Sequence, residues 1–64
     1  MNTEQAIETA YTNHIGALYK ALSQAILLAK GDEAEVTVAE TRFRKGLAHA
    51  ADIRARARRL ANLD

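Results

Sequence analysis

Two histidines and one aspartate are the residues whose types and spacing could bind a metal ion. His49 and Asp52 are three residues apart, which places them on one face of a helix. In an antiparallel hairpin His14 would lie near residue 52, so two imidazoles and a carboxylate would meet, a donor set found in zinc and iron sites. A hydrogen-bonded His49–Asp52 pair beside the helix seam is the simpler interpretation. We therefore predict no metal site and no cofactor.

Other residue patterns that support catalysis are absent from the sequence. The chain has no Cys, and Gly31 stands alone rather than in a glycine-rich phosphate loop. A chain of two helices also offers few directions from which side chains could converge on a substrate. We therefore expect a protein that is not an enzyme.

Basic residues are concentrated in the second part of the chain, although the net charge is only +1. Residues 1–40 carry two Lys against six acids, whereas residues 41–64 carry seven Lys or Arg against two acids. Arginine predominates there, and its planar fork suits phosphate. The side chains that could form a face for nucleic acid or an acidic partner are Arg42, Lys45, Arg54, Arg56, Arg58 and Arg59.

A structural interpretation of these arginines competes with the functional one. Asp52 and Arg56 have the favourable acid-to-base spacing of four residues, as do Glu40 and Arg44. The arginines of the last turns favour the helix carboxyl terminus, and in a hairpin they would lie near the acids of residues 4–8. No recognised nucleic-acid-binding motif is present. Binding of RNA or DNA therefore remains the alternative function.

The elements that must position these residues are two helices separated at Gly31. A glycine commonly ends a helix, and either Asp32 or Thr37 could cap the next one. We favour Asp32 because it directly follows the glycine, and Thr3 is the expected cap of the first helix. The sequence predicts helices over about 3–30 and 33–62 joined by a turn at about 31–33, in a single all-α antiparallel hairpin domain of residues 1–64.

Each predicted helix has an apolar stripe with residues three or four positions apart. The first stripe comprises Ile7, Tyr11, Ile15, Leu18, Leu22, Ile26 and Ala29, and the second Ala39, Phe43, Gly46 or Leu47, Ala50, Ile53, Ala57 and Leu60. Residues whose numbers sum to about 66 should face each other. Gly46 should then lie opposite Leu18 to Leu22, Gly16 opposite residues 48–51, and Tyr11 near Arg54 or Arg58.

The first helix has more apolar surface than one partner helix can cover. A second row through Ala10, Ala17, Ala21 and Leu28 widens its apolar arc beyond the roughly 100° that one partner needs. Chains of this size rarely build a sufficient core alone. A homodimeric four-helix bundle or a groove for a partner helix would cover this surface. The expected interface residues are Ile15, Leu18, Leu22, Ile26, Leu27, Leu28, Phe43 and Leu47.

These features together favour a small interaction or adaptor module that acts through self-association or through a partner helix. The amino terminus lacks the basic start of a secretory signal, and the apolar run at residues 25–29 is too short to span a bilayer. We therefore expect a cytoplasmic protein with no membrane partner.

Overall fold

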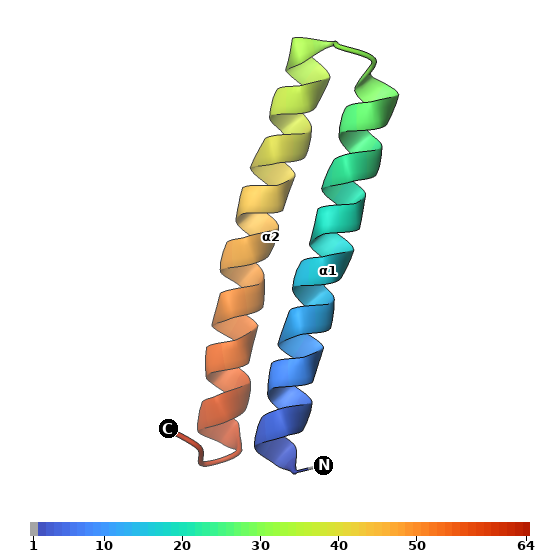
Figure 1. The fold of residues 1–64 in the computed structure, drawn as a ribbon. Coiled ribbons are helices and arrows are strands. Elements are labelled where there is room, and N and C mark those ends of the chain that lie inside the picture. Colours follow the sequence, from blue (N-terminus) through green and yellow to red (C-terminus); the bar gives the residue numbers. More distant parts are fainter. Residues whose placement is uncertain (1) are drawn as a thin grey trace.

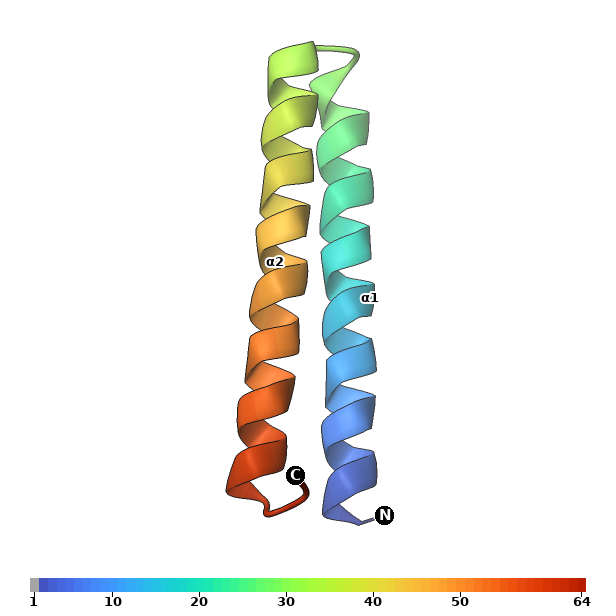
Figure 2. The same cartoon turned by 90° about the vertical axis from the view of Figure 1, so that its left-hand side faces the viewer.

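The computed structural model describes residues 2–64 as two long helices that run in opposite directions. Helix α1 spans Thr3–Ala29 and helix α2 spans Glu33–Leu60. They lie side by side along their whole length, with the bend at one end and both termini at the other (Figures 1 and 2). The predicted all-α hairpin is confirmed.

The bend is fixed by backbone conformation and by one capping side chain. Lys30 (φ 50°) and Gly31 (φ 85°) both adopt left-handed conformations, which turn the chain away from α1. The Asp32 amide then donates to the Ala29 carbonyl at 2.9 Å. The Asp32 carboxylate accepts hydrogen bonds from the amides of Ala34 and Glu35, at 3.0 and 3.2 Å. The start of α2 at Asp32, rather than at Thr37, is thereby confirmed.

The start of α1 corrects one prediction, because Asn2 and not Thr3 caps the helix. The Asn2 side-chain oxygen accepts the Gln5 amide at 2.8 Å, and the Gln5 side chain accepts the Asn2 amide at 3.3 Å. This reciprocal pair satisfies two backbone amides at once. It needs a Gln or Glu three residues after the capping residue, and Gln5 has that spacing from Asn2 but not from Thr3.

The seam between the helices is built largely from small residues. Within residues 2–64 the buried side chains are Ala29, Ala39 and Ala50. Gly46 meets Leu18, as expected, and a Cβ added at Gly46 would stand only 2.5 Å from the Leu18 Cδ2 atom. These two numbers sum to 64, so the helices are shifted by about two residues from the predicted register.

Four predicted seam positions are wrong. Gly16 has no neighbouring atom within 4 Å of an added Cβ, so it does not face α2. Ile26, Ile53 and Leu60 are exposed, by 40%, 45% and 85%. The seam passes instead through Ala25, next to Ile26, and through Arg54, next to Ile53. Because a helix has 3.6 residues per turn, adjacent residues point in directions about 100° apart.

The hairpin exposes far more surface than a compact protein of its mass. Its Cα dimensions are 45 × 19 × 9 Å and its radius of gyration is 14.7 Å, against about 11 Å for a compact chain of this length. Its accessible surface is 4964 Å², whereas a globular monomer of 7.0 kDa exposes about 4,000 Å². The two helices alone therefore leave about 900 Å² uncovered beyond the usual amount.

Candidate functional site

The two histidines lie together, although not in the arrangement predicted from the sequence. The rings of His14 and His49 meet edge to face across the seam, with centroids 6.1 Å apart and planes at 81°. The shifted register places His14 beside residue 49 rather than residue 52. Asp52 is engaged with Arg56 at 2.8 Å and not with His49. Among residues 2–64 no three acidic or histidine side chains are grouped closely enough to hold a metal ion.

The end of the hairpin that holds the termini carries a network of ion pairs around Arg58. The Arg58 guanidinium contacts Asp64 at 2.9 Å, Glu8 at 3.2 Å and Glu4 at 3.3 Å. Its side chain is only 17% exposed. This one arginine therefore ties the start of α1 to the end of the chain, and we name this region the open end.

Arg54 adds a second link at the open end. Its Nε donates to both carboxylate oxygens of Glu8 at 2.9 Å, and its guanidinium lies 5.3 Å from the centre of the Tyr11 ring. The expected contacts of Tyr11 and Glu8 with this arginine are confirmed. An arginine placed over an aromatic ring contributes a modest cation–π attraction as well.

The arginines of this network lower the pKa values of Glu8 and Asp64. The hydrogen bond from Arg54 holds the pKa of Glu8 below its usual value of 4.5. The hydrogen bond from Arg58 similarly lowers the pKa of Asp64 below 3.8, while Asp64 in turn raises the pKa of Arg58. All three groups therefore stay charged at neutral pH, and their attraction holds the start of α1 against the end of the chain.

The predicted basic face is divided by these contacts. Arg54, Arg56 and Arg58 are paired with carboxylates of the same chain. Three basic residues of the predicted face have no carboxylate of residues 2–64 within 4 Å: Arg42, Lys45 and Arg59. The predicted Glu40–Arg44 pair does not form. The sequence did not indicate the Arg58–Asp64 contact, since Asp64 lies beyond the end of α2.

One broad face of the hairpin is hollowed along its length, and we name it the grooved face. Three hollows of about 420, 120 and 140 Å³ follow one another from the bend towards the open end. Their walls on this face are made by Ala10, Ala21, Ala25 and Leu28 of α1 and by Val38, Arg42 and Ile53 of α2. Because alanine side chains are short, they leave room for side chains from outside.

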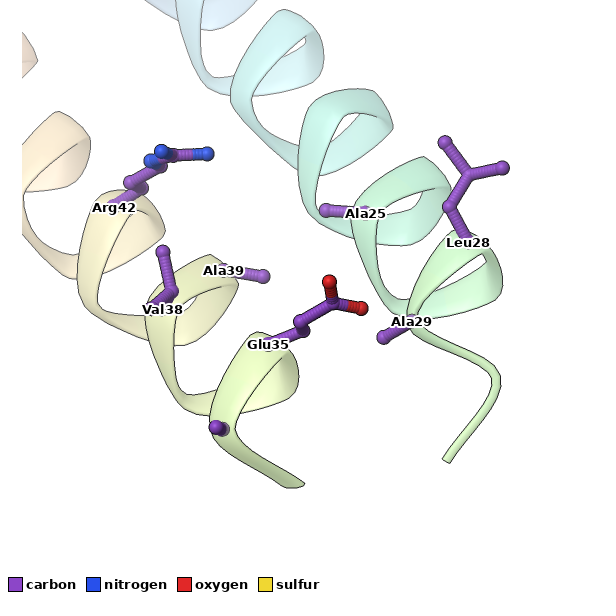
Figure 3. Close-up of a pocket in the computed structure, with 8 residues that line it drawn as sticks. Ala25, Leu28, Ala29, Glu35, Val38, Ala39 and Arg42 are labelled. Carbon is purple, nitrogen blue, oxygen red and sulfur yellow. The ribbon is translucent and has the colours of Figure 1, made fainter. Parts of the chain in front are cut away.

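The largest hollow lies beside the bend (Figure 3). Ala25 and Ala29 form its α1 wall, and Leu28 stands at its edge. Glu35 and Arg42 reach across from α2 towards α1, so the hollow has an acidic and a basic border.

The predicted interface residues fall into two groups. Half-buried in or beside the seam are Ile15, Leu18, Leu22, Phe43 and Leu47, while Ile26, Leu27 and Leu28 are exposed. Leu28 lines the grooved face, whereas Leu27 lines none of the three hollows and lies about 100° further round α1. Val38 and Ile53 are exposed on the grooved face and were not predicted as interface residues, and Ile53 was expected in the buried stripe of the second helix.

No protein-family model, curated protein or solved structure matches this chain. No helix of residues 2–64 combines the length and the apolar character that crossing a membrane requires.

Proposed function

We propose that this chain is a small, non-enzymatic interaction module that associates with itself as a homodimeric four-helix bundle. Within residues 2–64 the hairpin buries only three alanines, while Leu28, Val38 and Ile53 stand exposed on one face. Helical hairpins commonly complete their core by pairing in this way. The grooved face is the surface that the second copy covers.

The exposed area is the observation that carries this proposal. The hairpin exposes 4964 Å², about 900 Å² more than a compact monomer of its mass. A stable interface of ordinary size buries about 800 Å² on each partner. One second copy laid along the grooved face would therefore remove the excess.

Two adjacent leucines allow a matched test of the proposal. Leu27 and Leu28 are exposed by 75% and 73%, but Leu28 alone lines the grooved face. Leu28→Glu would bury a charge in the interface and should convert the dimer to monomer, whereas Leu27→Glu should leave the dimer intact. Light scattering coupled to size-exclusion chromatography measures the mass of each variant, and circular dichroism confirms that both remain helical.

The outcome distinguishes self-association from binding of a partner helix. If the unmodified chain is a folded monomer at high micromolar concentration, the proposed homodimer is wrong. The grooved face would then be a binding site for a helix of another protein. If both variants dissociate equally, the interface does not lie on the grooved face.

The alternative function is binding of RNA or DNA through the unpaired basic residues. Arg42, Lys45 and Arg59 have no acidic partner within 4 Å among residues 2–64, so their charges are free to contact phosphate. Three side chains of the predicted face are nevertheless neutralised within the chain. A gel-shift titration at low and moderate salt, with an Arg42→Ala/Lys45→Ala variant as the comparison, tests this alternative. Absence of any shift at low salt would contradict it.

A further inference from the structure

We infer that the second copy lies antiparallel to the first, so that the bend of each hairpin covers the open end of the other. This inference rests on the proposed self-association and specifies its geometry. The same grooved face is used by both copies, as the two-fold symmetry of most homodimers requires.

The charges along α2 change sign from one end to the other. Its first turn carries Glu33 and Glu35, and its last turn carries Arg58 and Arg59. Glu33 and Glu35 make no ion pair within residues 2–64. Of these two acids Glu35 lines the largest hollow, so an antiparallel partner would bring basic side chains to it, whereas a parallel partner would bring its own acids to the same end. Opposite charges across an interface fix orientation because like charges placed together are costly.

A two-fold axis perpendicular to the helices would pair each helix with its own copy. The middle of α2 lies between residues 46 and 47, so facing residues of the two copies would have numbers that sum to about 93. Glu35 would then lie within about one helical turn of Arg54 of the second copy, which lines the hollow nearest the open end. Arg42, at the rim of the largest hollow, would lie near Asp52 of the second copy.

The same axis would match small residues along α1. The contact of Gly46 with Leu18 places the middle of α2 level with residues 17 and 18 of α1, so facing residues of the two α1 helices would have numbers that sum to about 35. Ala10 of one copy would meet Ala25 of the other, and Ala21 would meet His14. Short side chains on both sides allow helix axes to approach to about 8 Å. The hollows beside Ala10, Ala21 and Ala25 are consistent with this close approach.

Distance measurements between nitroxide labels test the orientation directly. The chain contains no native Cys, so Glu33→Cys labels only the bend and Arg59→Cys labels only the open end. Both positions are exposed and lie outside the three hollows. Pulsed electron paramagnetic resonance should give about 40 Å between two bend labels and about 38 Å between two open-end labels, from the helix rise of 1.5 Å per residue.

A sample that mixes the two labelled chains serves as the control, because in it the antiparallel dimer should give a short distance instead of a long one. When chains labelled at the bend are mixed with chains labelled at the open end, the antiparallel dimer should show an additional distance below about 25 Å, since neighbouring helix axes lie only 8–10 Å apart. A short bend-to-bend distance in a dimer would overturn the antiparallel arrangement and leave self-association standing. A monomeric mass with no distance between chains would instead contradict the proposed function.

Discussion

The two ends of the hairpin are held in different ways. At the open end, Arg54 and Arg58 bind Glu4, Glu8 and Asp64, so opposite charges are satisfied within the chain. At the bend, Asp32 caps α2, but Glu33 and Glu35 have no basic partner within residues 2–64. Beside them lies the largest hollow, with Leu28 and Val38 exposed at its edge.

This difference indicates which part of the chain would gain most from the self-association that we propose. The open end has its ionic partners in place, although exposed ion pairs contribute little free energy each. The bend leaves both apolar surface and charge unmatched. Because burial of apolar surface is the main favourable contribution to folding, the bend should gain most from a second copy.

The largest effect should follow from enlarging the residue midway between the two ends. Gly46→Leu would force several carbon atoms into the space that Leu18 occupies, since even a Cβ would stand 2.5 Å from it. Overpacking of this kind costs about 1–3 kcal/mol. Chemical denaturation monitored by circular dichroism measures the loss. Gly16→Leu is the matched control, because its surroundings are open and a better helix former should stabilise α1 slightly.

Removal of the helix caps should have an intermediate effect and should differ between the two ends. Asp32→Ala removes the acceptor for two amides and should lower the free energy of unfolding by about 1 kcal/mol. Asn2→Ala removes a cap from a terminus that is free to fray, so we expect a smaller loss. Equal losses in thermal unfolding would show that the bend is no more dependent on its cap than the open end.

Acidification should have the smallest effect and should act on the open end. Because the folded pKa of Glu8 lies below 4.5, its pairing with Arg54 stabilises the fold above that pH and is lost as pH falls through the lowered value. The melting temperature should therefore be level from pH 7 to about 5 and decline towards pH 3. Glu8→Gln should lessen the decline, and Glu40→Gln, at a residue outside the ion-pair network, should not. An unchanged profile in Glu8→Gln would contradict this role of the ion pair.

The sequence predicted the hairpin well because its signals are local. Gly31 followed by Asp32 marks both the end of one helix and the start of the next, and the three- to four-residue apolar spacing needs no knowledge of the partner. The contact of Gly46 with Leu18 followed from the length of the turn. The predicted register of the two helices differs from the observed one by about two residues, because Lys30 as well as Gly31 adopts a left-handed conformation.

The grooved face was harder to predict because burial depends on the exact rotation of each helix. Ile53 has the spacing of a seam residue, yet the adjacent Arg54 occupies the seam by binding Glu8 and covering Tyr11. A charged side chain with a long apolar stem can do this. Apolar spacing alone therefore placed Ile53 and Leu60 inside, whereas the structure exposes them on the outside.

Sedimentation equilibrium of the unmodified chain tests the central claim most directly. If the hairpin completes its core with a second copy, the mass should be twice the 7.0 kDa of one chain and should fall to 7.0 kDa only on dilution, with a melting temperature that rises with concentration. A stable 7.0 kDa species at every concentration, with one unchanging melting temperature, would contradict the account.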